Sequence, residues 1–126
     1  MERITIETAD GRDAFVPGAE LRGQVSWELE QPTQRIELRL FWYTRGKGTV
    51  DVQVVKIQRF DVIGLRGRHD FRFVLPDEPY SFSGKLISLV WALEAIAEPG
   101  ERSVRLELVV APAGKEIRLQ TVPRAN

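Results

Sequence analysis

The chain contains no cysteine among its 126 residues. This absence excludes disulfide bonds, cysteine nucleophiles and thiolate metal sites. There is one histidine, His69, with no carboxylate cluster at ligand spacing beside it, so we expect no metal and no cofactor. No apolar run approaches the ~20 residues that span a bilayer, and the opening stretch MERITIETAD has no apolar segment of the signal-peptide type. We therefore expect a cytoplasmic protein that does not insert directly into a membrane.

Charge of one sign is not in excess. The chain has 18 basic and 18 acidic residues, and its formal net charge is zero. Nucleic-acid binding and attraction to anionic membranes both need a basic surface, so neither is expected. Hydrophobic residues make up 43% and charged residues 29% of the chain, which is typical of a globular protein. The length predicts one domain over residues 1–126.

Catalytic motifs are also missing. None of the five serines lies in a Gly-x-Ser-x-Gly nucleophile motif. Asp77 and Glu78 are adjacent in a turn between two prolines, where their carboxylates diverge instead of meeting across a cleft. We therefore predict that the protein is not an enzyme.

Alternation of apolar and polar residues is the dominant pattern. It recurs in the runs 4–6, 21–29, 36–42, 50–57, 69–75, 104–110 and 117–119, with turn-forming stretches such as VPGAE and APAG between them. In TVDVQVVKIQ the alternation slips by one residue after Val54, which indicates a β-bulge. Many short strands with one polar face each predict an all-β, antiparallel β-sandwich.

One stretch, Ser81 to Gly100, fits two structures. At helical spacing, Leu86, Leu89, Val90 and Leu93 share a face, and Pro99 would end the helix. At strand spacing, Leu89, Trp91, Leu93 and Ala95 share a face, and the opposite face is also apolar. Periodicity alone does not separate a buried helix from a central strand.

Two segments resemble the N-terminal lobe of the arrestin fold, which bacterial sporulation-control proteins share. These are FVPGAELRG at 15–23 and GRHDFRFVLPDEPYSFSGKLISLVWALEA at 67–95. The resemblance implies one immunoglobulin-like sandwich of the arrestin-lobe type, with a strand at Leu86 to Ile96. It places Trp91 and Leu93 in a core with Phe71, Phe73, Trp27 and Leu40.

The resemblance has limits. Arrestins have two such lobes, and this chain has one. The early strand carries Arg3 where the arrestins' phosphate sensor has paired lysines, so phosphoreceptor binding does not follow. What the resemblance implies is a non-catalytic interaction or scaffold protein.

The aromatic run FWY is the first candidate site. Trp42 shares the core phase with Leu40, so Phe41 and Tyr43 point the other way, on the face of Arg39. Aromatic residues and arginine are enriched at interface hot spots, so Phe41, Tyr43 and Arg39 are candidate partner-binding residues. The alternative is that another segment of the chain covers the two rings.

The stretch GLRGRH is the second candidate. Arg66, Arg68 and His69 lie among glycines, and guanidinium groups with backbone amides can bind an anion such as phosphate. The alternative is a solvated turn, with His69 at a strand start and its ring over the core, since His69 alternates with Phe71 and Phe73.

These observations lead to one expected function and one alternative. We expect binding of a protein partner through an edge strand or the exposed aromatic face. That partner is a second copy of the chain or a membrane-associated protein. TVDVQVVKIQ, with no lysine before Lys56, is a strand whose edge would be open to pairing. The alternative is a β-sandwich that binds a small ligand or phosphate through Arg66 and Arg68.

Overall fold

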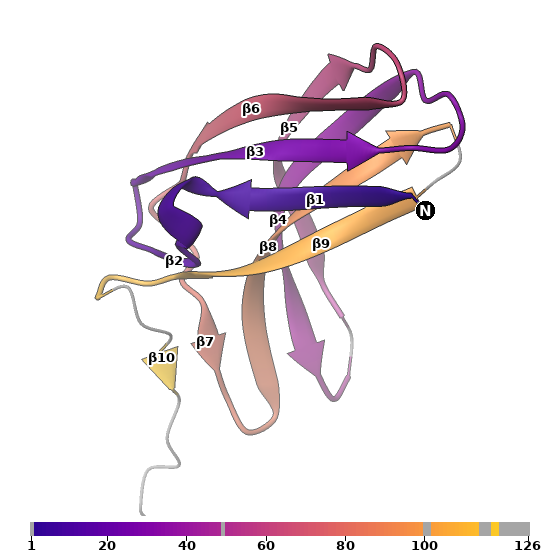
Figure 1. Ribbon diagram of the computed structural model, residues 1–126. Coiled ribbons are helices and arrows are strands. Elements are labelled where there is room, and N and C mark those ends of the chain that lie inside the picture. Colours follow the sequence, from indigo (N-terminus) through magenta and orange to yellow (C-terminus); the bar gives the residue numbers. More distant parts are fainter. Residues whose placement is uncertain (1, 49, 100–101, 114–116, 119–126) are drawn as a thin grey trace, which may run out of the picture.

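The chain folds almost entirely into β-strands (Figure 1). The computed structural model describes residues 2–48, 50–99, 102–113 and 117–118. The elements are β1 (Arg3–Thr8), the 3₁₀ turn η1 (Ala9–Gly11), β2 (Ala14–Phe15), β3 (Glu20–Glu28), β4 (Arg35–Gly46), β5 (Val52–Asp61), β6 (Arg66–Val74), β7 (Phe82–Ser83), β8 (Ile87–Glu98), β9 (Arg102–Val110) and β10 (Ile117–Arg118). No helix in this part of the chain is long and apolar enough to cross a membrane.

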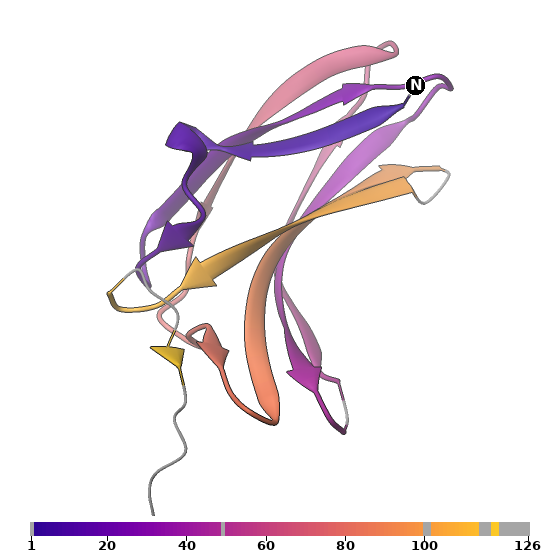
Figure 2. The same ribbon diagram turned by 60° about the horizontal axis from the view of Figure 1, so that its bottom comes forward.

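The strands form two sheets. The three-stranded sheet has the order β1-β3-β6, and the larger sheet contains β5-β4-β8. The far edge of β8 pairs first with β7 and then with β9. Figure 2 shows the three-stranded sheet lying over the larger one. The long ladders are antiparallel as predicted, but two short pairings, β2 with β9 and β7 with β10, are parallel.

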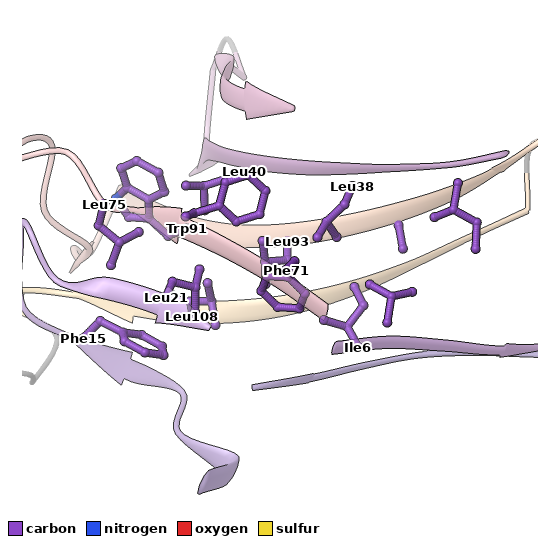
Figure 3. Packing of buried hydrophobic residues seen from close by; sticks show 14 of the residues in the cluster. Ile6, Phe15, Leu21, Leu38, Leu40, Phe71, Leu75, Trp91, Leu93 and Leu108 are labelled. Carbon is purple, nitrogen blue, oxygen red and sulfur yellow. The ribbon is translucent and has the colours of Figure 1, made fainter. Parts of the chain in front are cut away.

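The core lies between the two sheets (Figure 3). Alternate side chains of each strand turn inward because successive residues of a strand point to opposite faces. The six residues predicted to be buried all are: Trp27, Leu40, Phe71, Phe73, Trp91 and Leu93. Trp91 is fully buried, and its indole Nε1 donates a hydrogen bond to the carbonyl of Pro79 at 2.9 Å.

The ambiguous stretch is a strand, as the resemblance implied. β8 pairs with β4 along its whole length, from Ile87 opposite Gly46 to Glu98 opposite Arg35. Leu89, Trp91 and Leu93 face the core. Ala92 is also buried, on the opposite phase, because neighbouring strands and long side chains cover that face too. A central strand covered on both faces explains why both phases are apolar, and tertiary context overrides the helical propensity.

The predicted bulge lies in β5. Leu40 of β4 is opposite Lys56, but the next residue, Phe41, is opposite Val54. Val55 is therefore the extra residue, and it packs against the core. The bulge brings Val54 and Ile57, three residues apart, onto the same outer face of the larger sheet.

Side chains close the gap between β5 and β6, which are the edges of different sheets. Lys56 Nζ donates to the carbonyl of Val74, and Gln58 Nε2 donates to the carbonyl of Arg72, each at 2.7 Å. The edge of β6 is therefore occupied by side chains of its own chain. Within the described residues, β5 pairs with β4 alone.

Candidate functional site

The outer face of the larger sheet carries the predicted aromatic residues. Register places Phe41 between Val54 of β5 and Ala92 of β8, and Tyr43 between Val52 and Val90. Phe41 does not belong to the core cluster between the sheets, which agrees with its predicted outward direction. The face therefore contains an apolar centre that spans three neighbouring strands.

Phe41 is covered, which corrects the expectation of an exposed ring. Its exposed fraction is 4%. The guanidinium of Arg105, from β9, lies 5.0 Å from the ring centroid, and the Tyr43 ring stacks beside it at 5.9 Å. The cover is thus made by side chains rather than by a loop or a helix. Tyr43 and Arg39 remain partly exposed.

A hydrogen-bonded network holds Tyr43 in place. The Tyr43 hydroxyl donates to Glu107 Oε1 at 2.8 Å and accepts from Arg45 at 2.7 Å, while Arg45 also pairs with Glu107. The bond from Tyr43 lowers the pKa of Glu107; burial raises it, and the bond from Arg45 lowers it further, so the net direction is downward. Glu107 is therefore held as a carboxylate, and this part of the face is preorganised.

Glu37 is a buried carboxylate on the same face. Its exposed fraction is 3%, and it accepts hydrogen bonds from Arg39 and from Arg59. Burial raises the pKa of Glu37, but the two arginines together outweigh it, so the pKa lies below its ordinary value of 4.5. The predicted candidate Arg39 thus has a structural role as well, since it compensates a buried charge.

The contacts of Glu37 with Arg39 and Arg59 predict an acid-dependent loss of stability. A carboxyl whose pKa is lower in the folded than in the unfolded state contributes stability above its unfolded value, and that stability is lost as the pH falls below 4.5. Glu37→Gln should cost about 1 kcal/mol at pH 7, because both arginines are partly solvated. That difference from wild type should shrink in acid. Urea unfolding at several pH values measures it, and parallel pH curves would contradict the assignment.

The free side of β5 continues the apolar centre to the sheet edge. Val52, Val54 and Ile57 form a β5 aliphatic row, and their exposed fractions are 61%, 37% and 41%. All three lie on the outer face in register with Tyr43, Phe41 and Arg39. Residues 52–58 of the stretch TVDVQVVKIQ thus lie in an edge strand, as predicted, although the ammonium of Lys56 turns back to the Val74 carbonyl.

The predicted anion-binding residues divide between two faces. Arg66 and Arg68 lie on the outer face of the three-stranded sheet, where they line a hollow of about 470 Å³ with Arg3, Thr5 and Ser26. Arg66 also pairs with Glu28 at 3.5 Å. The His69 ring instead stacks on Phe60 at 4.2 Å between ring centroids. His69 therefore does not belong to the predicted anion-binding group, and Arg3 lies beside Arg66 and Arg68 instead.

No group of three or more potential ligands able to hold a metal ion occurs in the described part of the chain. The sequence reasoning did not single out Arg45, Arg105 or Glu107. Arg105 and Glu107 alternate with Val104 and Leu106, so the pattern resembles an ordinary solvated strand face. Only the pairing of β9 with β8 shows that these side chains reach the aromatic residues.

Comparison with solved structures supports an all-β fold of the Spo0M-like kind. The solved structure that shows it is the sporulation control protein Spo0M from Bacillus subtilis, with a TM-score of 0.63 and 19% identity. The match covers 87% of this chain and 49% of the Spo0M chain, so the chain spans about half of that protein's length. At this identity the similarity concerns the fold alone.

Two further structures match more weakly. A β-glucosidase from Listeria innocua in complex with gluconolactone has a TM-score of 0.48 and 10% identity, over 92% of this chain and 16% of the other. The alkylpurine DNA glycosylase AlkC from Pseudomonas fluorescens, bound to DNA, has a TM-score of 0.45 and 13% identity. That match covers 87% of this chain and 30% of the other. Neither supports an inference. No family model matches the chain, and no curated protein sequence matches it.

Proposed function

We propose that the chain is a non-catalytic interaction module, built on a single immunoglobulin-like sandwich of the arrestin N-terminal type. It binds a protein partner, either a second copy of itself or a membrane-associated protein, in the cytoplasm. The observation that carries the proposal is the β5 aliphatic row, which lies exposed at a sheet edge beside the apolar centre around Phe41 and Tyr43.

The physical basis is strand addition. An edge strand presents backbone N–H and C=O groups that another strand can pair with, and side chains beside the edge give specificity. β6 is closed to such pairing by Lys56 and Gln58, whereas β5 has one ladder partner in the described structure. Val54 and Ile57 would lie against the added strand, and Tyr43 would extend the contact.

Positive charge introduced into the β5 aliphatic row should abolish binding of the protein partner without unfolding the protein. We expect the double variant Val54→Lys, Ile57→Lys to lose self-association, measured by light scattering after size exclusion at micromolar concentration. It should also lose partner capture from the native host. Both side chains are partly exposed, so stability should change by no more than about 0.5 kcal/mol for each.

Val16→Lys is the matched control, because Val16 is 44% exposed and lies between β2 and β3 rather than at the gap between β5 and β6. This variant should behave as wild type. A monomeric wild type, together with unchanged partner capture by the double variant, would remove both the dimer and the β5 contact.

The second candidate is the small-ligand or phosphate site expected from Arg66 and Arg68. The hollow in which these residues meet Arg3 and two hydroxyls favours it, because its three guanidinium groups outnumber the two carboxylates, Glu7 and Glu28, that also line it. Guanidinium groups and hydroxyls together suit a phosphate or carboxylate. Titration with inorganic phosphate, followed at the amides of Arg66 and Arg68, separates this candidate from the interaction module.

A further inference from the structure

A notch interrupts the larger sheet on one side of β8. Leu89 pairs with Phe82 of β7, and Trp91 pairs with Leu108 of β9, so the edge of β8 changes partner at Val90. Figure 2 shows β7 and β9 approaching β8 from different directions. The notch opens into a hollow of about 360 Å³ on the outer face, within the range of about 300–1,000 Å³ found for small-molecule sites.

Polar groups gather in this hollow. Three of the chain's five serines line it, Ser81, Ser83 and Ser88, although serine is scarce in the sequence. Asp13 and Glu107 contribute carboxylates and Arg45 contributes a guanidinium. Val90 and Val109 give the hollow an apolar part.

Two of the serines are fixed by the backbone. Ser81 has an exposed fraction of 1%; its N–H donates to the Val110 carbonyl at 2.7 Å, and its Oγ accepts from the Val110 N–H at 2.9 Å. A hydroxyl that accepts still has a proton to donate. Ser88 Oγ accepts from the Gly84 N–H at 3.4 Å. The hollow therefore has a rigid wall.

Two of the remaining polar groups are available to a ligand, and the other two are already paired with each other. In the described structure the Ser83 hydroxyl and the Asp13 carboxylate have no hydrogen-bond or ion-pair partner, although both line the hollow. Arg45 and Glu107 are held in position by Tyr43. The hollow thus offers both donors and acceptors beside an apolar part.

We infer that this hollow, here called the serine hollow, binds a small neutral polyhydroxylated ligand of the sugar type. Two carboxylates against one guanidinium disfavour an anion, and the polar lining disfavours a purely apolar molecule. Sugar hydroxyls both donate and accept, so they can satisfy Asp13, Arg45 and the serines together. The C–H face of a sugar ring suits Val90 and Val109. The lining residues of this hollow are different from the β5 aliphatic row that carries the contact proposed above.

Titration of the ¹⁵N-labelled protein with glucose, followed by amide chemical shifts, tests the assignment. We expect shifts at Ser83, Ser88, Val90 and Val109 with a dissociation constant in the millimolar range. Inorganic phosphate should leave these amides unchanged. Ser83→Ala and Asp13→Asn should each weaken glucose binding about fivefold, since each removes a hydrogen-bonding group at the ligand.

Ser103→Ala is the matched control, because Ser103 lies on β9 outside the hollow. It should bind glucose as wild type does, and the spectrum of each variant reports whether it is folded. The inference is overturned if these amides do not shift at glucose concentrations up to about 100 mM. It is equally overturned if Ser83→Ala and Ser103→Ala bind alike, or if phosphate alone moves these amides.

Discussion

Trp91→Ala is expected to lower the free energy of unfolding by about 3–5 kcal/mol, the range for removing a large aromatic side chain from a core. Trp91 has no exposed surface, and it packs with Leu40 and Leu108 between the two sheets (Figure 3). The variant also leaves the Pro79 carbonyl without its indole donor. Urea unfolding followed by circular dichroism measures the loss.

Trp91→Phe separates the two contributions. Phenylalanine keeps most of the ring but cannot donate to Pro79, so we expect a smaller loss of about 1–2 kcal/mol. If alanine and phenylalanine were equally costly, the hydrogen bond rather than packing would dominate. If alanine cost under 1 kcal/mol, the central position of β8 in the core would be wrong.

Gly23→Ala is the second substitution with a large expected effect. Gly23 lies on the inward phase of β3, and a Cβ there would clash with the backbone carbonyl of Glu7 and lie 2.6 Å from Phe71 Cζ. Backbone cannot give way as a flexible side chain can, so β1 and β3 must separate. We expect a loss of about 3 kcal/mol, at the upper end for overpacking, measured by thermal and urea unfolding.

A double variant tests the cause. Phe71→Leu alone should be destabilising, but combined with Gly23→Ala it should cost less than the sum of the two changes, because the ring contact is gone. It should not restore wild-type stability, because the Glu7 carbonyl remains. Strict additivity would show that Phe71 takes no part in excluding a side chain from position 23.

The sequence predicted the structural features that depend on the alternation of apolar and polar residues within one segment and on the turns beside it. Most of the strands, the bulge after Val54, and the burial of Trp27 and Phe71 follow from the side-chain phase of individual segments. The strand at Ile87–Glu98 needed more, because a segment covered on both faces has no distinctive period. A resemblance over the neighbouring motifs settled that element.

The candidate sites could be predicted only in part, because contacts between distant strands are not visible in local patterns. The outward direction of Phe41 was predictable, but its cover by Arg105 depends on β9 lying two strands away. Arg66 and Arg68 were found as neighbours in sequence, whereas Arg3 joins them only through the β1-β3-β6 order. The serine hollow exists because β8 changes its ladder partner, a property of topology rather than of composition.

The Tyr43 network has a consequence for how the two proposed sites would communicate. Arg45 and Glu107 line the serine hollow, and the same two side chains hold the Tyr43 hydroxyl at the apolar centre of the outer face. A ligand that draws either group toward itself changes the hydrogen bonds available to Tyr43. Thermodynamic linkage requires the reverse as well: a protein bound against Tyr43 would change the affinity of the hollow by the same factor. The pair of sites would then act as a coupled receptor, in which the small molecule adjusts the strength of the protein contact.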